Sequence, residues 1–132
     1  MESLRGKIRR YIRKGKILLQ EARKDLEIGN YNKCVSAAYF AVEAFANALF
    51  LIKKQKTRGY RGRIALVRSF IGDKYAEMME VLHDMRSDAD HRDKLMTRSD
   101  AEYAIKTAEE LINALVKKLK EFVPDLLKDL FD

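Results

Sequence analysis

The sequence has little of what disulfide-linked, turn-rich or disordered proteins need. Its single cysteine, Cys34, cannot form an internal disulfide, and its apolar neighbours favour a small buried thiol over a reactive one. One proline and six glycines in 132 residues are too few for a protein built of β-hairpins, and 47% hydrophobic residues are too many for a disordered chain. We therefore expect one helical domain over residues 1–132, located in the cytoplasm.

Long apolar runs are also scarce. Residues 1–16 contain none, so we expect no secretory signal, although their basic amphipathic pattern is also typical of a membrane-surface anchor. Residues 34–52 approach the length of a membrane span, but Ser36, Glu43 and Asn47 interrupt them. We interpret this segment as the central core helix of a protein that does not enter a membrane.

Positive charge, within a net charge of +7, is concentrated in two segments. Residues 1–24 hold nine Lys or Arg against two Glu, and residues 53–68 hold seven Lys or Arg and no acid. This segregation favours an anionic partner, most often nucleic acid, and the alternative is a solvated basic surface without a partner. The expected RNA-binding residues are Lys53, Lys54, Lys56, Arg58, Arg61 and Arg63.

Apolar residues that recur at spacings of three and four predict an all-α fold, an antiparallel bundle of about five main helices plus a short C-terminal helix. Asn30 is expected to cap the second helix, and Ser99 with Glu102 matches a capping box at the start of the fifth. The expected helices are 3–28, 31–54, a short helix that follows the basic connection KKQKTRGYRGR and ends at Gly72, a fourth that Asp73 caps, about 100–122, and a terminal helix with Leu126, Leu127, Leu130 and Phe131.

The residues best suited to chemistry are Arg86 and His91, in the polar segment DMRSDADHRD at 84–93, which is typical of a helix end followed by an exposed turn. Histidine can transfer protons near neutral pH, and arginine can stabilise charge on a phosphate, so the pair suits phosphodiester cleavage. On a regular helix, residues five apart point about 140° away from each other. Either the helix is broken between them, as the composition indicates, or two chains form the site around a two-fold axis.

Three other interpretations of this segment are open. Arg86 and His91 can be surface residues that pair with neighbouring aspartates. Asp88 and Asp90 beside His91 can bind a divalent cation, although the glycine and glutamate of a calcium loop are missing. Glu43, the only acid in the second helix, needs a partner if it is buried, and Arg86 is a candidate.

The stretch R-S-D-A-D-H at 86–91 resembles the signature of the HEPN family, an arginine and a histidine separated by four to six residues. The stretch Leu26–Tyr31 leading into Ala37–Ala44 is similar to that family's first helical hairpin, and the helix plan agrees over about residues 5–122. The resemblance implies a metal-independent endoribonuclease without a cofactor that leaves 2′,3′-cyclic phosphate ends. Members of the family are often homodimeric toxins that pair with a minimal nucleotidyltransferase.

The resemblance implies that Arg86 binds or stabilises the phosphate and that His91 acts as general base or acid. We expect Asp88, Asp90 and Glu43 to support them. Two departures stand out. Ser87 follows the arginine where the nucleases often have a polar amide, acid or histidine, and Asp93 stands where toxins silenced by nucleotide transfer have a tyrosine. Two alternatives from other classes are a non-catalytic nucleotide- or RNA-binding adaptor that pairs with a nucleotidyltransferase, and a plain dimerisation domain.

Overall fold

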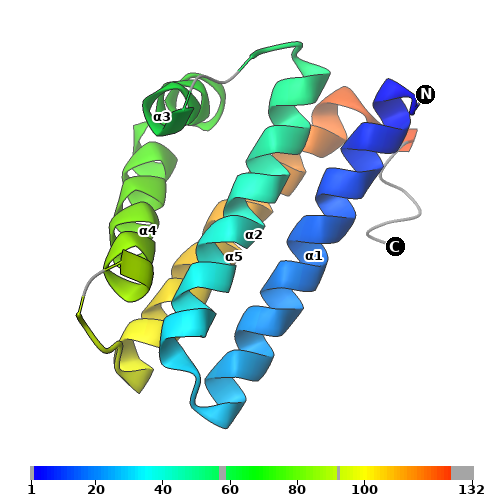
Figure 1. Cartoon of the computed structure of the whole chain (residues 1–132). Coiled ribbons are helices and arrows are strands. Elements are labelled where there is room, and N and C mark those ends of the chain that lie inside the picture. The colour runs from blue at the N-terminus through cyan, green and yellow to red at the C-terminus, as the bar shows by residue number, and fades with distance from the viewer. Residues whose placement is uncertain (1, 57–58, 92, 126–132) are drawn as a thin grey trace.

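The computed structural model describes residues 2–56, 59–91 and 93–125, and this part of the chain forms an all-α bundle (Figure 1). The arginine at 58 and the predicted terminal helix from 126 lie outside the described residues. The helices are α1 (Leu4–Ile28), α2 (Tyr31–Ile52), α3 (Gly59–Ile71), α4 (Asp73–His91) and α5 (Arg98–Phe122).

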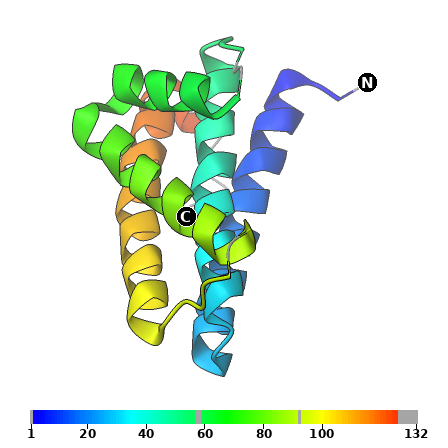
Figure 2. The same ribbon diagram turned by 60° about the vertical axis from the view of Figure 1, so that its left-hand side comes forward.

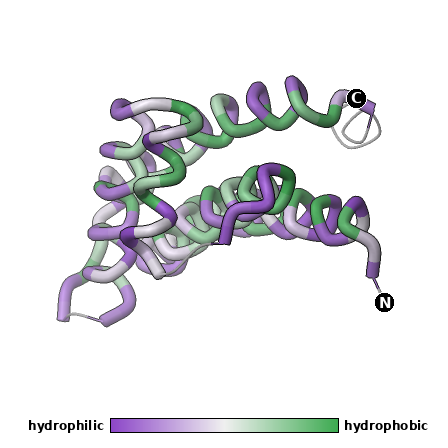
Figure 3. The backbone as a smooth tube through the Cα atoms, turned by 90° about the horizontal axis from the view of Figure 1, so that it is seen from above, coloured by the Kyte–Doolittle hydropathy of each residue, from purple (hydrophilic) through white to green (hydrophobic). Residues whose placement is uncertain are grey.

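Helix α2 is the centre of the bundle. Helices α1, α4 and α5 pack around it, and α3 crosses the end of the bundle above α4 (Figures 1 and 2). By length and composition α2 would suit a membrane span, yet most of its apolar residues are buried by the other helices. The hydrophobic side of α5 faces α1 and α2 in Figure 3. The prediction that residues 34–52 form the central core helix is therefore confirmed.

Helix boundaries follow the sequence closely at α1 and less closely elsewhere. Helix α1 ends at Gly29, whose φ of 85° suits glycine. Asn30 precedes α2, but its side chain makes no capping hydrogen bond, so that prediction was wrong. The basic stretch from Gly59 was predicted as a connection and is instead the first turn of α3, where the Tyr60 ring packs on His83.

The capping box of α5 lies two residues before the predicted one. Thr97 Oγ1 accepts a hydrogen bond from Asp100 N at 3.1 Å, and Asp100 Oδ2 accepts one from Thr97 N at 2.9 Å. These bonds lower the pKa of Asp100. The prediction of Ser99 with Glu102 was wrong because an aspartate three residues after a threonine supplies the same reciprocal bonds.

Cys34 is fully buried at the α2–α5 contact, as the sequence predicted. Burial, with a smaller contribution from the charge of Asp25, raises the pKa of its thiol to about 11. The thiolate is the nucleophilic form of cysteine, so this thiol is unreactive at neutral pH.

A tight contact between α1 and α2 depends on Gly15. A Cβ atom there would lie 2.6 Å from two carbons of the Phe45 ring and 3.2 Å from the Ala41 carbonyl oxygen. The ring fills the space that any larger residue at this position would need.

Gly15→Ala is therefore expected to lower the free energy of unfolding by about 1–3 kcal/mol, the usual cost of overpacking a core. The matched control is Gly62→Ala in α3, where an added Cβ meets nothing within 4 Å and alanine favours the helix by about 0.5–1 kcal/mol. Urea denaturation measures both, and equal effects of the two substitutions would contradict the account of this contact.

Candidate active site

Helix α4 continues without a break through the polar segment to His91, so the predicted break between Arg86 and His91 was wrong. The dense charge of both signs stabilises the helix here instead of ending it. Arg86 and Asp90 lie one turn apart, with Arg86 Nε 3.1 Å from Asp90 Oδ2. Such pairs stabilise helices by about 0.2–0.5 kcal/mol.

The side chain of Arg86 is fixed against α2. Its guanidinium carbon lies 4.9 Å from the centre of the Phe40 ring, within the range of a cation–π contact. Asp90, which pairs with Arg86, also accepts a hydrogen bond from Ser36 Oγ at 2.9 Å. Only about a quarter of the Arg86 side chain is exposed. A phosphate at this site would therefore meet a guanidinium that is already positioned.

His91 is the last residue of α4 and is exposed. Because α4 is helical between the two residues, His91 points about 140° away from Arg86 around the helix axis. A single chain thus places Arg86 against α2 and His91 at the exposed end of α4, on different sides of the same helix.

The supporting acids have partners of their own. Asp88 Oδ2 lies 3.9 Å from Lys94 Nζ. Glu43 Oε2 lies 3.4 Å from Arg63 Nη2, so the partner of Glu43 is Arg63 and not Arg86 as proposed from the sequence. Within residues 2–56, 59–91 and 93–125, no three His, Cys, Asp or Glu side chains gather as a metal site. The cation-binding interpretation of Asp88 and Asp90 therefore gains no support.

Comparison with known proteins agrees with the motif and the fold. The sequence model of the HEPN domain family matches residues 8–119. The chain belongs to the HEPN domain family. A UPF0332 protein of Archaeoglobus fulgidus is 33% identical over 85 residues, which cover 61% of this chain and 68% of that protein.

The other histidine of this HEPN domain, His83, lies in an aromatic cluster that sequence reasoning missed. The ring of His83 stacks on Tyr60 at 3.6 Å between centroids and meets Tyr39 edge-on at 5.5 Å. Burial, then the charge of Glu43, raises the pKa of Tyr39 to about 12, and burial also raises that of Tyr60 to about 12. The spacing in the sequence could have indicated this position, because His83 precedes Arg86 by three residues and therefore lies on the same side of α4.

The basic residues of 53–68 do not form one free surface. Lys54, Lys56 and Arg61 are exposed, and the Lys53 ammonium lies 4.4 Å from the centre of the Phe122 ring. Arg63 is largely covered and paired with Glu43. The exposed lysines at the end of α2 therefore remain the best candidates for contacts with phosphates.

Asn32 of the HEPN domain anchors the connection that follows His91. Its Nδ2 donates to the carbonyl oxygens of Ala89 at 2.9 Å and Lys94 at 3.1 Å, and its Oδ1 accepts from Met96 N at 2.8 Å. One amide thus holds both the end of α4 and the following loop on the first turn of α2. Sequence reasoning missed this residue because its partners are backbone groups more than fifty residues away.

Asn32→Ala is expected to lower the free energy of unfolding by about 1–3 kcal/mol, since it leaves polar backbone groups without their partner. Asn30→Ala, two residues earlier, is the matched control and should cost less than about 0.5 kcal/mol because its side chain makes no capping bond. Urea denaturation of both variants tests this, and a loss no greater for Asn32→Ala than for Asn30→Ala would count against the anchoring role.

Proposed function

We propose that this HEPN domain is a metal-independent endoribonuclease whose site combines Arg86 of one chain with His91 of a second. The observation that carries the proposal is the fixed guanidinium of Arg86, held between Phe40 and the Asp90–Ser36 pair. An arginine with this support on the family's signature motif suits a phosphate whose charge grows in the transition state. Family membership adds the expectation of RNA as substrate.

The reaction proposed is attack of a ribose 2′-hydroxyl on the adjacent phosphorus. The new O–P bond forms as the bond from phosphorus to the leaving 5′-oxygen breaks, which leaves a 2′,3′-cyclic phosphate and a free 5′-hydroxyl. Arg86 stabilises the charged phosphorane, and His91 accepts the proton of the 2′-hydroxyl or supplies one to the leaving oxygen. No electron transfer is needed, and the attacking group comes from the substrate itself.

The unbroken helix α4 supports the two-chain arrangement. Since Arg86 and His91 of one chain point in different directions, a substrate that must touch both is served better by two copies of α4 around a two-fold axis. The symmetric dimer then holds two equivalent sites, each with one arginine and one histidine. Asp90 serves as a positioning residue for Arg86 in this arrangement.

The biological setting proposed is the toxin component of a cytoplasmic toxin–antitoxin pair with a minimal nucleotidyltransferase. The second candidate is a non-catalytic nucleotide- or RNA-binding adaptor for such a partner. The exposed Lys54, Lys56 and Arg61 favour it, because they offer charge to phosphates without any catalytic group. The two functions differ in whether the wild-type protein cuts RNA.

Arg86→Ala and His91→Ala are each expected to slow RNA cleavage by at least about 100-fold, in line with the usual contribution of an acid–base group or an oxyanion donor. The helical circular dichroism signal should remain. Arg98→Ala is the matched control, because it removes an exposed arginine that lies outside the motif and pairs one turn away with Glu102 on α5, and it should leave the rate unchanged.

Cleavage should persist in excess chelator, end in a 2′,3′-cyclic phosphate and spare DNA, which lacks the attacking hydroxyl. Full activity in both alanine variants would exclude Arg86 and His91 as catalytic residues. If the wild-type protein binds RNA and cuts none, the adaptor function is the better account.

A further inference from the structure

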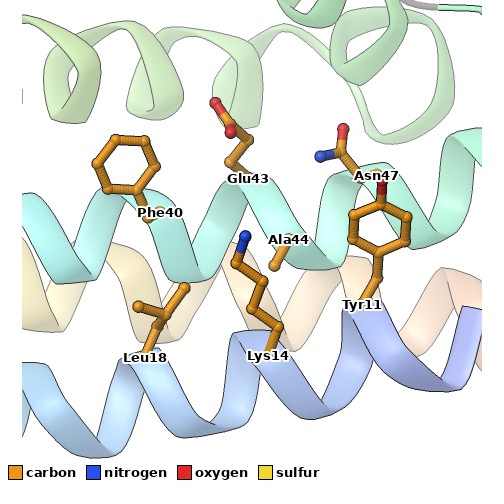
Figure 4. Close-up of a pocket in the computed structure, with 7 residues that line it drawn as sticks. All are labelled: Tyr11, Lys14, Leu18, Phe40, Glu43, Ala44 and Asn47. Carbon is orange, nitrogen blue, oxygen red and sulfur yellow. The ribbon is translucent and has the colours of Figure 1, made fainter.

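A cavity lined in part by Phe40 lies between α1 and α2 (Figure 4). Its volume is about 320 Å³, near the lower end of the range for small-molecule sites. Figure 4 shows Phe40, Glu43 and Asn47 rising from α2 on one side, with Tyr11 and Lys14 rising from α1 on the other. A single nucleobase suits such a space, because its two faces need apolar walls and its edge needs polar partners.

The cavity and the candidate active site share Phe40. One ring lines the cavity and also carries the Arg86 guanidinium 4.9 Å from its centre. A nucleotide whose base occupied the cavity would therefore place its sugar–phosphate close to Arg86. Aromatic side chains such as Phe40 and Tyr11 stack on bases of any sequence, with about 1–3 kcal/mol for each base.

The polar groups of the cavity favour one base over the others. Glu43 and Asn47 lie one helical turn apart, so their side chains leave α2 about 5–6 Å from each other on the same side. Arg63 pairs with one oxygen of the Glu43 carboxylate, and a carboxylate accepts about four hydrogen bonds over its two oxygens. Two adjacent N–H donors on a base edge would match the acceptor capacity that is left.

Guanine is the standard base with two adjacent donors on one edge, N1–H and the exocyclic amino group, and its O6 acceptor lies next to them. Adenine, cytosine and uracil each offer the carboxylate a single donor group on the corresponding edge. The Asn47 amide can donate to O6 while Glu43 accepts from the two donors. Lys14, exposed at the rim, adds positive charge for a neighbouring phosphate.

We propose that the cavity formed by Tyr11, Lys14, Phe40, Glu43 and Asn47 binds a guanine base of the RNA substrate and so directs cleavage to bonds next to guanosine. The assignment of this ligand as part of an RNA substrate rests on the function proposed above. The cavity then supplies sequence preference, and Arg86 and His91 supply the chemistry.

Binding of mononucleotides to the full chain tests the proposal without any cleavage step. Nuclear magnetic resonance or calorimetric titration should give an affinity for guanosine 5′-monophosphate about tenfold or more above those for the adenosine, cytidine and uridine monophosphates. Inosine 5′-monophosphate lacks the exocyclic amino group and should bind more weakly than the guanosine nucleotide. Equal affinities across these nucleotides would overturn the proposal.

Two variants separate the contacts. Asn47→Ala should weaken the guanosine and inosine nucleotides together, because both present O6, whereas Glu43→Gln should reduce the difference between them. Asn113→Ala is the matched control, since Asn113 lines a cavity of about 350 Å³ between α1 and α5. Because Glu43→Gln also disturbs the ion pair with Arg63, thermal unfolding checks that this variant is still folded. Asn47→Ala leaves that ion pair in place and therefore tests the cavity independently of it.

The cavity and the nuclease can fail separately. Guanine-selective binding in a protein that cuts no RNA supports the cavity and contradicts the nuclease. RNA cleavage at all bases alike, with Asn47→Ala no different from Asn113→Ala in binding, overturns the cavity and leaves the nuclease standing.

Discussion

The burial of α2 is the constraint on which the other features depend. Three helices cover its apolar sides, and the largest fully buried side chains of the described chain include Tyr39, Phe45 and Phe50 from this helix. Each fully buried large side chain contributes about 1.5–3 kcal/mol of hydrophobic free energy. The chain can therefore hold a few polar residues on α2 only where they have partners or reach a cavity.

Four polar residues of α2 meet this condition on a single stripe: Asn32, Ser36, Glu43 and Asn47. At 100° for each residue, these positions fall within about 60° of one another around the helix axis. Each of them has such a partner or lines the cavity. Asn32 anchors the loop after His91, Ser36 holds Asp90, Glu43 pairs with Arg63, and Asn47 lines the cavity. The stripe thus joins the core helix to the proposed chemistry.

Sequence reasoning found the helices because their apolar periodicity is strong, and it found Arg86 and His91 because the family motif marks them. It placed the end of α4 too early, because residues 86–91 have little apolar content. Low apolar content is typical of a turn, but it also fits a helix that an ion pair such as Arg86–Asp90 stabilises. The sequence also could not identify the partner of Glu43, because Arg63 contacts Glu43 only through the packing of α3. Interpreting Ser36, Glu43 and Asn47 as mere interruptions of an apolar run hid their common stripe.

Arg86 and His91 are proposed to act together across two chains, because α4 points them apart within one chain. Mixing equal amounts of Arg86→Ala and His91→Ala protein and allowing subunits to exchange tests it directly. Half of the resulting dimers contain one chain of each kind, and each of these has one intact site with an arginine and a histidine from different chains. RNA cleavage is expected to return to about a quarter of the wild-type rate. If the mixture stays as inactive as the separate variants while the subunits demonstrably exchange, the two-chain site is contradicted.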